Sequence, residues 1–323
     1  YAAIFRRVVY IFSILMKKFL VKTTLVSIPF LLMVLIVWIF DPLNYFGQNN
    51  IIPQERKDNF FLMPGKDMTK LGIQKKCSIS KTTFNALLIG DSRVMPIDTS
   101  MINTITDAEW FNFSLAGCYT RSAVKSFFWA IKNVNREVDF VYWGHNFWGV
   151  NDIDRFSDIE DVNASVLKYI TSKRIWGFIK DLCVLELDSN EAMSTYEEEN
   201  GEAKQIEYWE SIVFRKQQQV TTEHIRVQPI IYELIDSVAN YCERHDIRLI
   251  HVYPPEYKDL LAIIQSDSIT NAEYQKYLNH LSQYEFYNFN QGHWIESPED
   301  FRDPMHPKEH VYNNIVDSIF NSR

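Results

Sequence analysis

A serine and a distant pair of an aspartate and a histidine in this 323-residue sequence have the side chains of a nucleophilic site. In the run ALLIGDSRVMP, residues 86–96, an apolar stretch ends abruptly on Gly-Asp-Ser, with the serine at Ser92. A serine hydroxyl is a weak nucleophile until an imidazole accepts its proton. The run DPMHP near the C-terminus offers His306 for that role, and Asp303 to orient and stabilise the imidazolium. We therefore predict a triad of Ser92, Asp303 and His306.

Attack by a serine on an ester carbonyl creates a negative oxygen, which needs hydrogen-bond donors aimed at it. Two more runs end on suitable donors: FNFSLAG leads to Gly117, and YWGHN leads to Asn146. A glycine lets the backbone approach a ligand without a side chain in the way. We expect the backbone N–H groups of Ser92 and Gly117 and the side-chain amide of Asn146 to form an oxyanion hole.

The elements that must position these groups are apolar runs that alternate with helix-like stretches. The runs are residues 84–90, 108–116, 138–144, 247–254 and 284–290, and the helix-like stretches include 122–135, 228–245 and 271–283. This alternation predicts an α/β fold with a parallel sheet covered on both faces. In such folds ligands bind beyond the carboxyl ends of the strands. Proline favours the first position of a helix, so Pro307 places His306 at the cap of the final helix.

The four blocks are Gly-Asp-Ser at 90–92, Gly117, Gly-x-Asn at 144–146 and Asp-x-x-His at 303–306. In kind and order they resemble those of the SGNH (GDSL-like) hydrolase superfamily. The resemblance covers about 84–146 and 285–320, and Asn112 also matches the second block. It implies a three-layer α/β/α, flavodoxin-like domain without a cofactor, in which the triad and the oxyanion donors have the roles given above.

Two residues depart from the pattern of this superfamily. Phe147 follows Asn146 where an acid is usual, and Ser114 stands where a glycine is frequent. Neither change removes a catalytic group. Both indicate a branch away from the common esterases.

A membrane anchor is predicted near the N-terminus. Residues 23–40 carry no charge, and as a helix they would extend roughly 27 Å, close to the hydrocarbon thickness of a bilayer. A buried core helix is disfavoured by the lopsided flanking charge, and a cleaved signal peptide by the length of the apolar run and the missing cleavage site. Five basic residues precede the run and Asp41 is the first acid, so the N-terminus is expected in the cytoplasm and the rest outside it.

These signals divide the chain into segments. We expect a cytoplasmic basic, amphipathic segment (1–22), a transmembrane helix (23–40), a linker (41–83) and an SGNH-like domain (84–323) with an insertion at about 151–223. Beyond the five N-terminal cations, 28 of the 33 basic residues remain against 41 acidic ones. Because such a body repels polyanions, nucleic acid is excluded as a partner.

Four other side chains are candidates for binding substrate: Arg93, Trp148, His293 and Trp294. Each also has a plain structural interpretation, as an ion pair, as core packing or as a surface histidine. No metal site is predicted, because Pro307 argues against a ligand pair of His306 and His310 on one helix face.

The four cysteines, Cys77, Cys118, Cys183 and Cys242, would lie in an oxidising compartment, where one or two disulfides can form.

The anchor and the terminal Asp-x-x-His block resemble those of superfamily members that work beside polytopic membrane O-acyltransferases, as in alginate acetylation or teichoic-acid D-alanylation. That resemblance implies an extracytoplasmic serine acyltransferase that moves an acyl group, acetyl by preference, to a cell-surface or secreted glycan through an acyl-Ser92 intermediate. An anchored carbohydrate esterase or deacetylase is the first alternative. The second is a non-catalytic scaffold for a glycan or a membrane enzyme.

Overall fold

The structure is a computed structural model that divides into two compact units. It describes residues 2–43, 45–46, 68–79, 81–150, 154, 156–157, 159, 165–188 and 202–321. The first unit comprises residues 1–63 and 162–189, and the second comprises residues 64–161 and 190–323. The expected linker and the expected insertion therefore lie partly outside the described residues.

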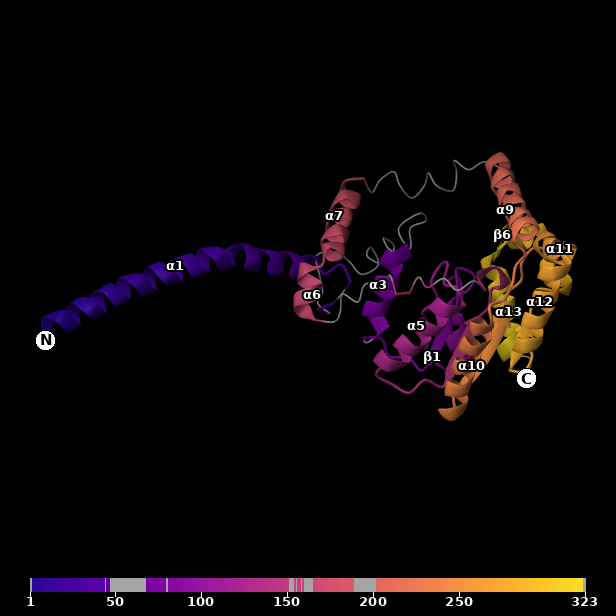
Figure 1. Cartoon of the computed structure of the whole chain (residues 1–323), viewed down its shortest axis with the longest axis horizontal. Coiled ribbons are helices and arrows are strands. Elements are labelled where there is room, and N and C mark those ends of the chain that lie inside the picture. The colour runs from indigo at the N-terminus through magenta and orange to yellow at the C-terminus, as the bar shows by residue number, and fades with distance from the viewer. Residues whose placement is uncertain are drawn as a thin grey trace. The chain divides into compact units, whose positions relative to one another are not determined.

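The first unit is built on one long helix, α1 (Ala2–Phe40), with two shorter helices beside its C-terminal end (Figure 1). These are α6 (Val166–Thr171) and α7 (Lys173–Asp188). Among the described residues, α1 is the helix long and apolar enough to cross a membrane, over Phe12–Phe40. The helix runs without a break from Ala2, so the segment 1–22 continues directly into the apolar run 23–40.

The second unit contains a parallel five-stranded sheet in the order β2-β1-β3-β4-β5. Its strands are β1 (Ala86–Ile89), β2 (Trp110–Asn112), β3 (Phe140–Gly144), β4 (Arg248–Tyr253) and β5 (Phe286–Asn288). Each falls inside one of the five apolar runs of the sequence. The order is that of flavodoxin-like folds, in which the strand order reverses beside β1 and opens a ligand site there.

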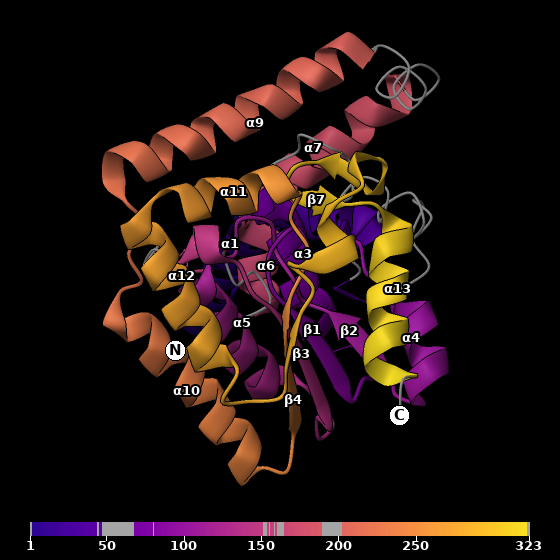
Figure 2. The ribbon, with the colours of Figure 1, turned by 90° about the vertical axis from the view of Figure 1, so that its right-hand side faces the viewer.

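Helices cover both faces of this sheet (Figure 2). The helices of the second unit are α3 (Met68–Ile79), α4 (Thr99–Thr106), α5 (Thr120–Asn133), α9 (Glu202–Glu223), α10 (Pro229–Arg244), α11 (Lys258–Ser266), α12 (Ser268–Leu281) and α13 (Glu309–Phe320). Three single turns, η1 (Phe147–Gly149), η3 (Gly292–Ile295) and η4 (Pro298–Asp300), follow strand ends or precede the last hairpin. The three-layer α/β/α architecture expected from the sequence is confirmed.

Burial on alternate sides of the strands explains the layers. Ala86 and Leu88 of β1 pack in one core with residues of α4 and α13. Leu87 and Ile89 point to the opposite face because strand side chains alternate, and they are equally buried. On that side α5 contacts both β1 and α10. A strand buried on both faces reads as a continuous apolar run, which is why the sequence indicated these strands so clearly.

Two local expectations differ from the structure. His306 and Pro307 do not cap the last helix but form β7, a two-residue strand antiparallel to β6 (Phe301–Asp303). Helix α13 begins later, at Glu309, with Lys308 as its N-cap residue. In addition, part of the expected linker is helical: α3 contacts α5 and buries Ile73.

A pair of histidines is buried between β3 and β4. His145 Nε2 lies 2.7 Å from His251 Nδ1, and His145 Nδ1 lies 3.0 Å from the Tyr277 hydroxyl. The two histidines are at most 1% exposed. Burial lowers the pKa of His251 to about 3 and that of His145 well below its usual value. Both rings are therefore neutral in the folded protein at neutral pH.

This pair makes the fold sensitive to acid. Unfolded histidines bind a proton near pH 6.5, whereas His251 resists protonation in the folded state until about pH 3, so the free energy of unfolding falls as the pH drops below 6.5. At pH 5 the expected loss from His251 alone is about 2 kcal/mol. Urea unfolding of the full chain in detergent at pH 7.5 and 5 measures it. His251→Gln should flatten this dependence, and the exposed control His293→Gln should not; an equal slope in all three proteins would contradict the account.

Candidate active site

The turn after β1 projects Ser92 from the sheet edge. Gly90 precedes the turn with φ +147°, and a Cβ there would lie 2.5 Å from Val94 and 3.0 Å from the Gly144 carbonyl. Only glycine fits this close approach of two strand ends. The Asp91 carboxylate accepts the Arg93 N–H at 3.0 Å and closes the turn. Ser92 itself is left half-buried between two buried neighbours.

The three predicted triad side chains meet in a chain of hydrogen bonds. Ser92 Oγ lies 2.7 Å from His306 Nε2, and His306 Nδ1 lies 2.8 Å from Asp303 Oδ2. The β6–β7 hairpin brings Asp303 and His306 opposite each other, and the Met305 N–H holds Asp303 Oδ1 at 2.9 Å. Asp303 is buried, while the His306 side chain is 25% exposed and within reach of a substrate. The short β6–β7 ribbon therefore positions His306 beside Asp303, where the sequence had led us to expect a helix cap.

The predicted oxyanion donors surround the same strand end. The Leu115 N–H donates to the Gly90 carbonyl at 3.0 Å, which holds the loop leading to Gly117 beside β1. Gly117 has φ +63°, a conformation that favours glycine. Among the residues that the structure describes, the N–H groups of Ser92 and Gly117 have no hydrogen-bond acceptor. Both remain available to a ligand.

Asn146 is fixed at the same edge through both ends of its amide. Its Nδ2 donates to Asp91 Oδ2 at 2.5 Å, and its Oδ1 accepts the Trp148 N–H at 2.9 Å. The side chain is half-buried, and its amide has a second hydrogen besides the one that is donated to Asp91. Asn112 braces the neighbouring loop: its amide contacts the Val94 carbonyl at 3.1 Å and accepts the Ser114 N–H at 3.1 Å.

Arg93 lies in a buried ionic network and is not exposed to a substrate. The residue is 1% exposed, and its guanidinium contacts Asp91, the His145 carbonyl and Glu256. Burial alone would lower the pKa of Arg93, but Asp91 and Glu256 outweigh it and raise the pKa above its ordinary value. Trp148 belongs to the same network, since its indole N–H donates to Glu256 at 2.9 Å. For both residues the structural interpretation fits these contacts.

His293 and Trp294 belong to a hollow that the triad residues do not line. They line a hollow of about 460 Å³ against α13, together with Asp300 and His310, whereas Ser92 and His306 do not line it. His310 pairs with Asp300 at 2.8 Å and so points to a different partner from His306. Among the described residues, no group of three or more histidine, cysteine or acidic side chains could hold a metal.

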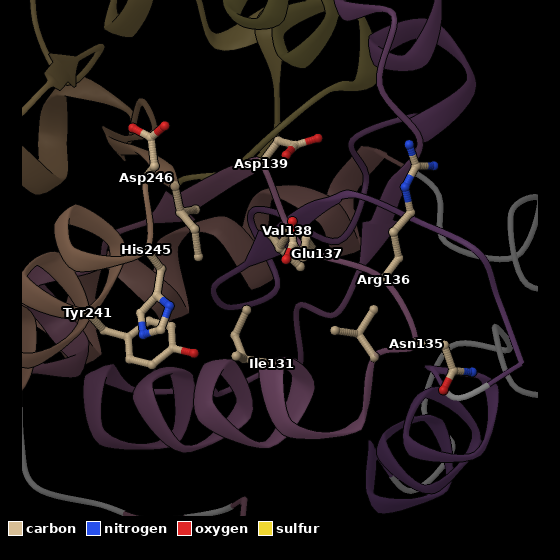
Figure 3. Close-up of a pocket in the computed structure, with 11 residues that line it drawn as sticks. Ile131, Asn135, Arg136, Glu137, Val138, Asp139, Tyr241, His245 and Asp246 are labelled. Carbon is tan, nitrogen blue, oxygen red and sulfur yellow. The ribbon is translucent and has the colours of Figure 1, made fainter.

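Figure 3 shows a second hollow, which has a volume of about 550 Å³. It lies where β3 and β4 begin, and Arg136, Asp139 and His245 are among its lining residues. Catalytic groups in parallel sheets gather at the other edge. This hollow therefore adds nothing to the predicted chemistry.

The described cysteines contribute no competing nucleophile. Cys77, Cys118 and Cys242 are buried, and within the described part of the chain no disulfide joins them; the Cys183 side chain lies outside the described part. Burial raises the pKa of the Cys118 thiol to about 12, which keeps it protonated beside Gly117.

Two residues that support the site were missed by the sequence analysis. Lys75 of α3 donates to the Ser114 carbonyl at 2.6 Å and so fixes the loop that carries Gly117. Burial lowers the pKa of Lys75 to about 7. Glu256, which anchors Arg93, follows β4 in the run YPPEY. Its position just beyond a strand end was a usable signal, whereas nothing in the sequence around Lys75 indicates its role.

No protein-family model matches this sequence, and no curated protein is significantly similar to it. Two solved structures align with most of the chain. A proposed platelet activating factor from Streptococcus pneumonia is 13% identical with a TM-score of 0.42, over 82% of this chain and 94% of its own. A proposed acylhydrolase from Bacteroides fragilis NCTC 9343 is 12% identical with a TM-score of 0.35, over 73% and 86%. At these values neither structure bears on the reaction of this chain.

Arg93 is predicted to be essential for stability. Arg93→Met leaves the carboxylates of Asp91 and Glu256 buried without their counter-charge, so the free energy of unfolding should fall by about 3–5 kcal/mol. Urea unfolding of the full chain in detergent measures the loss. The matched control is Arg302→Met, an exposed arginine beside Asp303, with an expected change below about 0.5 kcal/mol. Equal losses in the two variants would contradict the network.

Proposed function

We propose that this protein is a membrane-anchored serine enzyme that carries an acyl group on Ser92 and transfers it to a hydroxyl of an extracytoplasmic glycan. The observation that carries the proposal is the hydrogen-bond chain from Ser92 Oγ through His306 to Asp303, at 2.7 and 2.8 Å. Such a chain activates the hydroxyl for attack on a carbonyl. The partly exposed His306 supports the same conclusion. So do the N–H groups of Ser92 and Gly117, which have no acceptor among the described residues.

In the first half-reaction Ser92 Oγ attacks the acyl carbonyl while its proton passes to His306 Nε2. Asp303 holds the His306 ring through Nδ1 and stabilises the imidazolium. The N–H groups of Ser92 and Gly117 and the amide of Asn146 stabilise the oxyanion. The C–O bond to the donor then breaks, and His306 returns its proton to the leaving oxygen, which leaves an acyl-Ser92 ester.

In the second half-reaction a hydroxyl takes the place of the leaving group. His306 accepts the proton of the incoming hydroxyl, whose oxygen attacks the acyl carbonyl. The Ser92–acyl bond then breaks, and His306 passes the proton to Ser92 Oγ, which restores the free hydroxyl. A sugar hydroxyl gives acyl transfer, and water gives hydrolysis. Which one reacts depends on how well the site orients an acceptor and excludes water.

The finer parts of the proposal rest on the sequence. The order of the four motif blocks resembles the SGNH superfamily, and the apolar helix α1 suits a single-pass anchor. Together they favour an acetyl group as cargo, a glycan as acceptor and a polytopic membrane O-acyltransferase as the protein that supplies the acyl group.

Acyl transfer is tested with the full chain in detergent, incubated with an activated acetyl ester with and without a panel of oligosaccharides. Mass spectrometry should find one acetyl group on Ser92, and acetyl on sugar forming faster than acetate. Ser92→Ala should lose turnover by a factor of about 10³ or more, because the nucleophile is gone. Fast release to water alone would assign an esterase. An unmodified Ser92, with Ser92→Ala restoring glycan modification in cells, would assign the scaffold.

The oxyanion role is tested separately at Asn146. Asn146→Ala removes one donor to the transition state, so kcat for the activated ester should fall by about 10²–10³ with little change in KM. The comparison variant is Asn314→Ala, at an exposed position of α13 that lines the hollow without the triad, and it should keep full activity. A rise in KM at constant kcat would instead make Asn146 a ground-state binding residue.

A further inference from the structure

Helices α6 and α7 pack against the last turns of the apolar helix α1 (Figure 1). Val37 of α1 is completely buried, and Met33 and Val34, about one turn earlier, are half-buried. The residues on the other sides of the same turns, such as Leu31 and Leu35, stay exposed. One face of α1 is therefore covered within the candidate span Phe12–Phe40.

A buried carboxylate fixes this contact just beyond the end of the span. Asp41 is completely buried, and its side chain accepts the N–H groups of Tyr45 and Phe46 at 2.6 and 2.8 Å. The Tyr169 hydroxyl of α6 donates to Asp41 at 2.8 Å, and its ring stacks on Tyr45 with centroids 4.4 Å apart. A buried charge with three donors holds one geometry. Helix α6 is thus tied to the end of α1.

The contact between Tyr169 and Asp41 sets how deep α6 and α7 lie relative to the span of α1. From Met33 to Phe40 the helix rises about 10 Å, and the covered face of α1 begins at Met33. If α1 spans a bilayer as far as Phe40, this stretch lies at the boundary between hydrocarbon and headgroups. Exposed residues of α6 and α7 then lie close to the membrane surface.

The chemistry of that outer side suits a lipid surface. Residues 165–180, SVLKYITSKRIWGFIK, contain four basic residues and no acid, in a chain of net charge −8. Val166 and Leu167 are 50% and 60% exposed, and Lys168 and Lys173 are exposed beside them. Tyr169 and Ile170, in the next turn of α6, are buried. The exposed residues therefore lie in the first turn of α6 and at Lys173, the first residue of α7. Apolar side chains next to cations are typical of helices that lie at a membrane interface.

We propose that Val166, Leu167, Lys168 and Lys173 form a membrane-contact surface that inserts shallowly into the bilayer and binds anionic phospholipid headgroups. This inference rests on the membrane-spanning role of α1 in the proposed function, and is independent of the chemistry at Ser92. Through it the first unit would hold the outer end of α1 in one orientation to the lipid surface.

The test is photo-crosslinking of the full chain in lipid nanodiscs, with a photoreactive amino acid in place of Leu167. Nanodiscs of phosphatidylcholine alone are compared with nanodiscs that also contain phosphatidylglycerol. Mass spectrometry should find lipid adducts at position 167, enriched for phosphatidylglycerol. Lys168→Gln with Lys173→Gln should reduce this enrichment by about fivefold or more, as expected when basic residues leave an anionic surface. The matched control, Lys258→Gln with Lys276→Gln at exposed positions of the second unit, should leave it unchanged.

A second photoreactive residue, in place of Leu31 within the span, distinguishes failure of the contact surface from failure of the membrane anchor. Lipid adducts at position 31 without any at position 167 would overturn the contact surface and leave the anchor intact. A crosslink from position 167 to a protein chain would also overturn it and assign a protein contact. No lipid adduct at position 31 would refute the anchor and the contact surface together. Hydrolysis of the activated ester, measured on the same samples, reports on Ser92 separately.

Discussion

The buried guanidinium of Arg93 holds together three of the strand ends from which the candidate site is built. It contacts Asp91 after β1, the His145 carbonyl after β3 and Glu256 after β4. A buried charge is tolerated only when its partners are in place, so the three loops are forced into one arrangement. Ser92 lies within this arrangement, and Asn146 joins it by donating to Asp91. The network therefore positions both Ser92, the proposed nucleophile, and Asn146, a proposed oxyanion donor.

Much of the fold was predictable because it depends on local patterns. The five parallel strands are buried on both faces and read as apolar runs, and the motif residues follow them directly. The triad was predictable from residue type and order, since Ser92, Asp303 and His306 match a known arrangement of blocks. Their proximity was not predictable, because sequence order carries no distance.

The errors have a common physical origin, in tertiary contacts that override local preference. Pro307 suits a helix start, but pairing of β7 with β6 draws it into a ribbon. Arg93 follows the nucleophile and so was a candidate for binding substrate, yet Glu256, which neutralises it, lies 163 residues away. Residues 162–189 belong with α1 through Tyr169 and Asp41, a contact across 128 residues. Nothing near these positions in the sequence indicates such partners.

The central claim is that His306 activates Ser92, and labelling with a fluorophosphonate tests it most directly. Such a probe bonds covalently to a serine only when a neighbouring base accepts the hydroxyl proton. The full chain should acquire one adduct, on Ser92, which His306→Gln abolishes and His310→Gln preserves. Labelling of another residue, or labelling of Ser92 that survives His306→Gln, would contradict the account.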